Sequence, residues 1–180
     1  MKLTNDIFFL IGLKLDLPDI FILCQTNKRI YRIYTKDYFW TEKLHRDFPN
    51  KDKLTKKFNS SKDYYVFLWK LLNLKQRLNI SSDIYTIYSL QDINLNNQNL
   101  IELPKSIKIL DNLVTLIVRN NKLKKLPNIF PPSLMYLDVS DNKLEELPDL
   151  LPSNLRILRA WNNHNLRKSS YNYPGVFVFM

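Results

Sequence analysis

Residues 113–123 read LVTLIVRNNKL, and closely related stretches stand on both sides of them. The segment that starts at Leu134 reads LMYLDVSDNKL, and the one that starts at Leu90 reads LQDINLNNQNL. A fourth copy starts at Leu155 and keeps the pattern as far as Asn163. Starting positions 90, 113, 134 and 155 are separated by 23, 21 and 21 residues. A regular period of this length indicates a repeat architecture.

Each position of the repeat has a physical role. In a short strand, alternate side chains such as Leu116 and Val118 point inward, and the intervening ones lie on the opposite face. Asn121, at the ninth position, is predicted to bond backbone groups where the chain turns, so that successive asparagines form a buried ladder. The Leu126-Pro127 step keeps the return segment extended, since proline lacks an N–H and restrains its predecessor.

This pattern resembles the leucine-rich repeat, which implies a solenoid over residues 90–168 with a parallel sheet on its concave face. The return segments 126–133 and 147–154 resemble the short repeat subclass of secreted bacterial effectors, in which the convex side is extended. The first return is longer, and Lys105 to Asn112 leaves room for a helical turn.

Upstream of the repeats, the sequence predicts short helices. Thr4, Asn5 or Asp6 caps a first helix that ends near Leu15. Pro18 suits the first turn of the next helix. Beyond a polar loop, residues 63–78 show the apolar spacing of a longer amphipathic helix.

The order of residues in this region is informative. It runs Leu3-Thr4-Asn5-Asp6-Ile7, then Leu15-Asp16-Leu17-Pro18-Asp19-Ile20, then Leu23-Cys24-Gln25-Thr26-Asn27-Lys28-Arg29-Ile30-Tyr31, and finally Asp37-Tyr38-Phe39-Trp40. This order resembles the F-box. Thr4 replaces a proline that contacts the partner in that family, and Thr26 replaces the usual valine.

The F-box resemblance implies a substrate-recognition adaptor of an SCF-type ubiquitin ligase. The F-box would bury apolar helix positions against the adaptor subunit, which attaches to a cullin, and the repeats would capture a protein substrate of unknown identity. Some of the matching positions must instead hold the helices together. By matching position, the candidate partner-facing residues are Leu3, Ile7, Leu15, Pro18, Ile20, Leu23 and Tyr31.

The outward strand positions of the repeats carry aromatic, methionine and arginine side chains. These residue types are enriched at interface cores, because they offer a large contact area or several hydrogen bonds. The alternative is that they pack beneath the helical linker or the C-terminal tail, for which residues 176–179 are the candidate. The predicted target-binding residues are Ile117, Arg119, Met135, Tyr136, Ile157, Arg159 and Trp161.

Composition limits the remaining hypotheses. Hydrophobic residues make up 45% of the 180 residues, which is enough for packed cores without disulfides or metal. The single Cys24 cannot form an internal disulfide and suits a reducing compartment. No uncharged stretch approaches the roughly 18 residues that a membrane helix needs. We therefore expect a cytoplasmic or nuclear protein without a membrane segment, in the host cytosol if it is a viral or bacterial effector.

Nucleic-acid binding is a weaker hypothesis. The formal net charge of +10 would attract phosphates. However, abundant Lys, Asn, Ile and Tyr with a single alanine, Ala160, is the residue usage of an AT-rich coding sequence. Such usage inflates lysine without selection for phosphate contacts.

Catalytic and metal-binding patterns are missing from the sequence. His45 and His164 lie far apart, without carboxylates or cysteines at ligand spacing. Two glycines leave no phosphate-binding glycine loop. Cys24 falls at an F-box position that is usually apolar, which favours a buried side chain over a nucleophile. We expect no enzyme activity and no cofactor.

Together these patterns predict an α+β chain with an all-α N-terminal part. The predicted ranges are an F-box-like domain at 1–50, a helical linker and repeat cap at 51–89, leucine-rich repeats at 90–168 and a tail at 169–180. The alternative function is a stand-alone repeat scaffold that binds proteins without ligase coupling.

Overall fold

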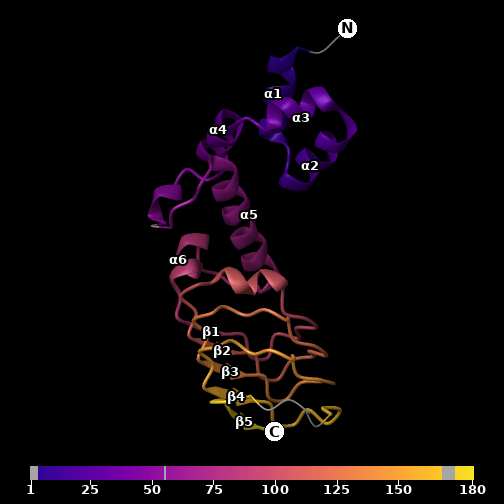
Figure 1. Cartoon of the computed structure of the whole chain (residues 1–180), viewed down its shortest axis with the longest axis vertical. Helices are drawn as coiled ribbons and strands as arrows, with labels where there is room; N and C mark the ends of the chain where they lie inside the picture. Colours follow the sequence, from indigo (N-terminus) through magenta and orange to yellow (C-terminus); the bar gives the residue numbers. More distant parts are fainter. Residues whose placement is uncertain (1–3, 55, 168–172) are drawn as a thin grey trace. The chain divides into compact units, whose positions relative to one another are not determined.

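A computed structural model of the chain describes residues 4–54, 56–167 and 173–180. The chain forms two compact units, Met1–Leu72 and Asn73–Met180, called here the helical unit and the solenoid unit. Within the described residues, six α-helices precede five short parallel strands, which confirms the predicted α+β arrangement (Figure 1).

The α-helices are α1 (Asn5–Lys14), α2 (Leu17–Thr26), α3 (Lys28–Tyr34), α4 (Asp37–Asp47), α5 (Ser61–Arg77) and α6 (Ile84–Ser89). The strands are β1 (Asp92–Asn94), β2 (Thr115–Ile117), β3 (Tyr136–Asp138), β4 (Ile157–Arg159) and β5 (Phe177–Phe179), and short 3₁₀ turns lie at η1 (Lys51–Lys53) and η2 (Lys105–Ile109). Among the described helices, none is both long and apolar enough to cross a lipid bilayer.

The helices of the helical unit start where polar caps or proline permit. Thr4 is the N-cap of α1, and its hydroxyl accepts a hydrogen bond from the Ile7 N–H at 3.4 Å. Pro18 lies in the first turn of α2, where its missing N–H costs nothing. Both features confirm the predicted helix starts. Asn27 caps α3 through its side-chain oxygen, which accepts from the Arg29 N–H at 2.8 Å.

Tyr34 is the centre of the contact between α1 and α3. Its ring is buried, and its hydroxyl donates to the Phe8 carbonyl at 2.6 Å. Gly12 lies directly beneath the ring, so that a Cβ at this position would overlap the Tyr34 side chain. The indole N–H of the buried Trp40 donates to the Tyr34 carbonyl at 2.7 Å. Gly12 therefore allows the two helices to approach closely.

A buried lysine links α4 to the end of α1. The Lys43 side chain is 1% exposed, and its ammonium group donates to the Leu13 carbonyl at 3.0 Å. It also forms an ion pair with Asp47 at 2.9 Å, and Asp47 accepts a hydrogen bond from the Tyr65 hydroxyl at 2.8 Å. Burial and this bond to Asp47 raise the pKa of Tyr65 well above its usual value. Lys43 thus satisfies a carbonyl that the end of α1 leaves without a helical partner.

In the solenoid unit the strands stack in chain order from β1 to β5, each parallel to the next (Figure 1). The register places Ile93, Leu116, Leu137 and Leu158 side by side, and all four are buried. Two residues further along, a second buried row follows, made of Leu95, Val118, Val139 and Ala160. The interior is therefore continuous from strand to strand, as the repeat pattern predicts.

The predicted asparagine ladder is confirmed. Asn121, Asn142 and Asn163 are each 7% exposed. The side-chain oxygen of Asn142 accepts from the Leu123 N–H of the previous repeat at 3.0 Å, and that of Asn163 accepts from the Leu144 N–H at 2.9 Å. Each of these asparagines therefore holds a backbone N–H of the preceding copy.

The residue before each ladder position has a left-handed backbone. Asn97, Asn120, Asp141 and Asn162 have φ values of 60°, 55°, 55° and 54°. Asn and Asp adopt this conformation more readily than other residues with side chains. The repeat thus specifies a turn at its eighth position, in addition to the predicted strand and asparagine ladder.

The return segments differ as expected. The first contains the 3₁₀ turn η2, within the stretch for which a helical turn was predicted. In the segments 126–133 and 147–154 there is no helix, and the chain is extended or turning.

Candidate binding surfaces

The structure separates the predicted partner-facing residues of the helical unit by burial. Pro18 and Tyr31 are exposed, with 55% of Tyr31 accessible to solvent. Ile20 is 0% exposed and belongs to the core of the unit. Ile7, Leu15 and Leu23 are half-buried, and Leu3 lies outside the described residues.

Other apolar side chains of the same helices are more exposed than the predicted ones. Leu10 on α1 and Ile22 on α2 are 58% and 57% exposed, although both are large aliphatic residues. The run from Ile7 to Ile11 is apolar throughout, and a helix can bury only part of such a run against one neighbour. This run of consecutive apolar residues was the sequence signal for an additional exposed face. Three further apolar residues are exposed on the helices α1, α2 and α4, namely Ile11, Phe21 and Tyr38.

The side chains between the buried positions of each strand form rows across the exposed face of the sheet, called here the open face. One row follows the register from Thr115 through Tyr136 and Ile157 to Phe177. The next row contains Ile117, Asp138, Arg159 and Phe179, of which Asp138 is buried. The open face is therefore most aromatic and apolar at its β4–β5 end.

Every predicted target-binding residue keeps some solvent exposure on this unit. Met135 is 44% and Trp161 is 46% exposed, and Arg119 and Arg159 are also exposed. The remaining three, Ile117, Tyr136 and Ile157, are half-buried.

Tyr136 and Arg159 contact each other across neighbouring strands. The Arg159 guanidinium lies 5.5 Å from the centre of the Tyr136 ring, within the range of a cation–π contact. Burial, followed by the nearby Asp138 carboxylate, raises the pKa of Tyr136 above its usual value.

Arg119 lies beside the left-handed turn of the next repeat. Its Nε is 2.5 Å from the Asp141 carboxylate. Hydrogen bonds from Asn162 and Arg119 lower the pKa of Asp141. This pair fixes the Arg119 side chain at the edge of the open face.

The described part of the C-terminal tail forms a strand. Phe177–Phe179 make β5, which pairs in parallel with β4 and extends the sheet. The Phe179 ring stacks on Trp161 with 5.9 Å between ring centres. Because β5 lies beside β4, Met135, Arg159 and Trp161 keep their exposed surface.

Cys24 and His45 both belong to the helical unit. Cys24 is half-buried, and burial raises the pKa of its thiol, with a smaller opposing effect of Lys62. The Nδ1 of His45 lies 2.8 Å from the Thr41 carbonyl on the same helix. Among the described residues, no three His, Cys, Asp or Glu side chains are grouped as a metal site would require.

Comparison with known proteins yields no family: no family model matches the chain, and no curated protein matches it.

Proposed function

We propose that this protein is a substrate-recognition adaptor of an SCF-type ubiquitin ligase. In this proposal the helical unit binds the adaptor subunit, which attaches to a cullin, and the solenoid unit, as a short leucine-rich-repeat array, binds a target protein. The observation that carries the proposal is the set of large apolar side chains exposed within the F-box-like region, namely Leu10, Ile22 and Tyr31. These residues lie on α1, α2 and α3, and α3 packs against both other helices; a contiguous exposed apolar surface is typical of protein interfaces.

Thr4, which departs from the F-box pattern, is compatible with this proposal. The threonine hydroxyl caps α1, so α1 begins at Asn5 without the proline that the family usually has. The lost proline contact would weaken adaptor binding while leaving the helix in place.

The open face of the solenoid unit supports the second half of the proposal. Met135, Arg159 and Trp161 combine flexible apolar, charged and aromatic surface on neighbouring repeats. Arg and Trp are enriched among the residues that dominate binding energy at interfaces.

Co-purification of the full chain with the SCF adaptor subunit tests the proposal. We expect the unmodified chain to retain the adaptor subunit and Ile22→Asp to lose it, because a carboxylate would be desolvated at an apolar interface. Ile129→Asp is the matched control, since Ile129 is an isoleucine of similar exposure (58%) in the solenoid unit. Failure of the folded, unmodified chain to bind the adaptor subunit would refute the proposal, as would equal loss in both variants.

A stand-alone repeat scaffold is the second candidate, and the burial of Ile20 favours it. Ile20 matches a partner-facing F-box position, yet it is fully inside the helical unit. The scaffold hypothesis predicts that the chain does not bind the adaptor subunit. It also predicts that Trp161→Ala weakens target binding, whereas Ile22→Asp leaves target binding unchanged.

A further inference from the structure

The helical unit contains a surface cavity of about 430 Å³ that the proposed adaptor function does not use. Its walls come from α1, from α3 with the two residues after it, and from the start of α4. Three positively charged side chains line it, Arg29, Arg32 and Lys36, together with the rings of Phe9 and Tyr38. No Asp or Glu is among its lining residues.

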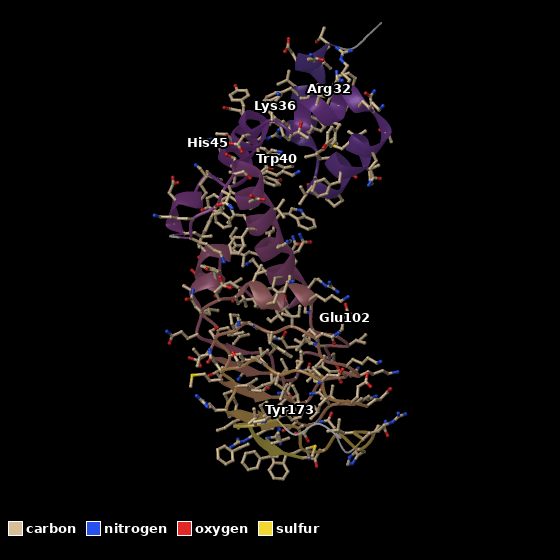
Figure 2. All side chains as sticks on the ribbon, in the orientation of Figure 1. Arg32, Lys36, Trp40, His45, Glu102 and Tyr173 are labelled. Atoms are coloured by element: carbon tan, nitrogen blue, oxygen red, sulfur yellow. The ribbon has the colours of Figure 1, made fainter. Side chains whose placement is uncertain are left out.

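Two of these three cations have no partner among the described residues. Arg29 is engaged, because its Nε donates to the Asn5 side chain at 2.7 Å and its guanidinium lies 5.5 Å from the centre of the Phe8 ring. Neither Arg32 nor Lys36 forms a side-chain hydrogen bond or an ion pair with any described residue. Arg32 lies on α3 and Lys36 follows the end of that helix, and both side chains line the cavity (both labelled in Figure 2). The cavity therefore holds two cations without a side-chain partner, and Arg29, whose partners Asn5 and Phe8 are uncharged, adds a third positive charge.

The carboxylate closest in sequence to Lys36 is occupied elsewhere. Asp37 accepts hydrogen bonds from the backbone N–H of Ser61 at 2.8 Å and from the Ser61 hydroxyl at 2.9 Å. It is consequently committed to the start of α5 and does not line the cavity.

The apolar part of the cavity is aromatic. The rings of Phe9 and Tyr38 are stacked, with 5.6 Å between ring centres and 20° between ring planes. Tyr38 is 66% exposed, so its ring remains accessible to a flat ligand. Ile33, on α3 between the two free cations, adds to the apolar wall.

We propose that this cavity binds a ligand in which a doubly charged phosphoryl group is joined to a flat apolar ring. A phosphoryl group carries about −1.5 to −2 charges at neutral pH and three strong acceptor oxygens. It therefore offsets more of the positive charge of this cavity than a singly charged carboxylate does, and its oxygens can accept from both free cations. Arg32 supplies a planar donor pair for two phosphoryl oxygens and Lys36 a compact charge for the third, while Tyr38 stacks on the ring. This proposal does not rest on the proposed adaptor function.

Calorimetric titration of the full chain at low salt with three probes tests the ligand chemistry. Phenyl phosphate has both the charge and the ring, inorganic phosphate lacks the ring, and benzoate has the ring with a single charge. We expect phenyl phosphate to bind roughly tenfold more tightly than either of the others, since each lacks one of the two contacts. Equal binding of benzoate or of inorganic phosphate overturns the proposal.

Variants of exposed residues locate the binding. Arg32→Gln and Lys36→Gln are each expected to weaken phenyl phosphate binding about tenfold, the effect of losing one charge-assisted hydrogen bond. Lys28→Gln is the matched control, because Lys28 is exposed on the same helix and does not line the cavity. Circular dichroism establishes that each variant is folded. An equal effect of all three substitutions would indicate general electrostatic attraction and overturn the site.

Two larger probes distinguish the sources of such a ligand. Tighter binding of adenosine monophosphate than of phosphotyrosine amide supports the site and identifies a free nucleotide. The reverse order also supports the site and identifies a phosphorylated protein side chain. If the folded chain binds neither probe and does not bind phenyl phosphate, the inference is wrong.

Discussion

Replacement of Asn142 by alanine should destabilise the solenoid unit. The Asn142 side-chain oxygen accepts from the Leu123 N–H at 3.0 Å, and its amide donates to the carbonyls of Val118 at 2.9 Å and Val139 at 3.0 Å. The bonds with Leu123 and Val118 join this repeat to the one before it, whereas the bond to Val139 lies within the repeat. Asn142→Ala removes all of them and leaves a small void in a buried region.

The carbonyls and the N–H respond differently to this loss. The Val118 carbonyl keeps a second bond, from Asn121 at 2.9 Å, and the Val139 carbonyl keeps one from Asn163 at 3.1 Å. The Leu123 N–H is buried and loses the only partner that the structure shows for it. An orphaned buried donor costs about 1–3 kcal/mol, and the weakened shared bonds add about 1 kcal/mol. We therefore expect the free energy of unfolding to fall by about 2–4 kcal/mol.

Urea unfolding followed by circular dichroism measures this loss. The control is Gln98→Ala, because Gln98 holds the ninth position of the first repeat but is exposed. Its side chain makes no hydrogen bond to any described residue, so we expect a change within about 0.5 kcal/mol. If Asn142→Ala destabilises the chain no more than Gln98→Ala does, the asparagine ladder does not hold the repeats together.

Three further predictions concern single side chains. Gly12→Ala places a methyl group in the Tyr34 ring, so the free energy of unfolding should fall by about 1–3 kcal/mol; an unchanged melting temperature would contradict the close helix contact. Lys43→Met keeps the apolar stem but leaves its carbonyl and carboxylate partners without the ammonium group, and we expect a loss of about 2–3 kcal/mol in urea unfolding. Asp141→Asn keeps a residue that tolerates the left-handed turn but removes the charge that pairs with Arg119. Because folding lowers the pKa of Asp141, its contribution to stability is present above pH ~4 and is lost as pH falls through the folded-state pKa; a stability difference between variant and wild type that stays constant from pH 7 to pH 2 would disprove this.

The solenoid could be predicted from sequence because its information is local and repeated. Leu116 and Asn121 each have a role defined by their own strand and by the adjacent copy, and interactions between neighbouring repeats dominate such folds. The spacing of the copies therefore predicted the parallel sheet, the ladder and the difference between the return segments. The left-handed turn was equally local, and the recurring Asn or Asp before each ladder position was its signal.

The helical unit was harder to predict in detail, because its short helices are apolar on more than one face. The sequence predicted where α1 and α2 begin, since caps and proline act within a single turn. It did not predict that Ile20 is buried while Ile22 is exposed. Both are isoleucines on one helix, and their burial depends on which neighbouring helix packs against each face.

The features that sequence patterns did not indicate all depend on contacts between distant residues. Lys43 is buried because the end of α1, 30 residues earlier, presents the Leu13 carbonyl to it. Arg32 and Lys36 line a cavity because α1 and the start of α4 complete its walls. Local sequence determines secondary structure and repeat register through hydrogen bonds and side-chain periodicity, whereas the packing of helices determines which charges and apolar side chains remain available for binding.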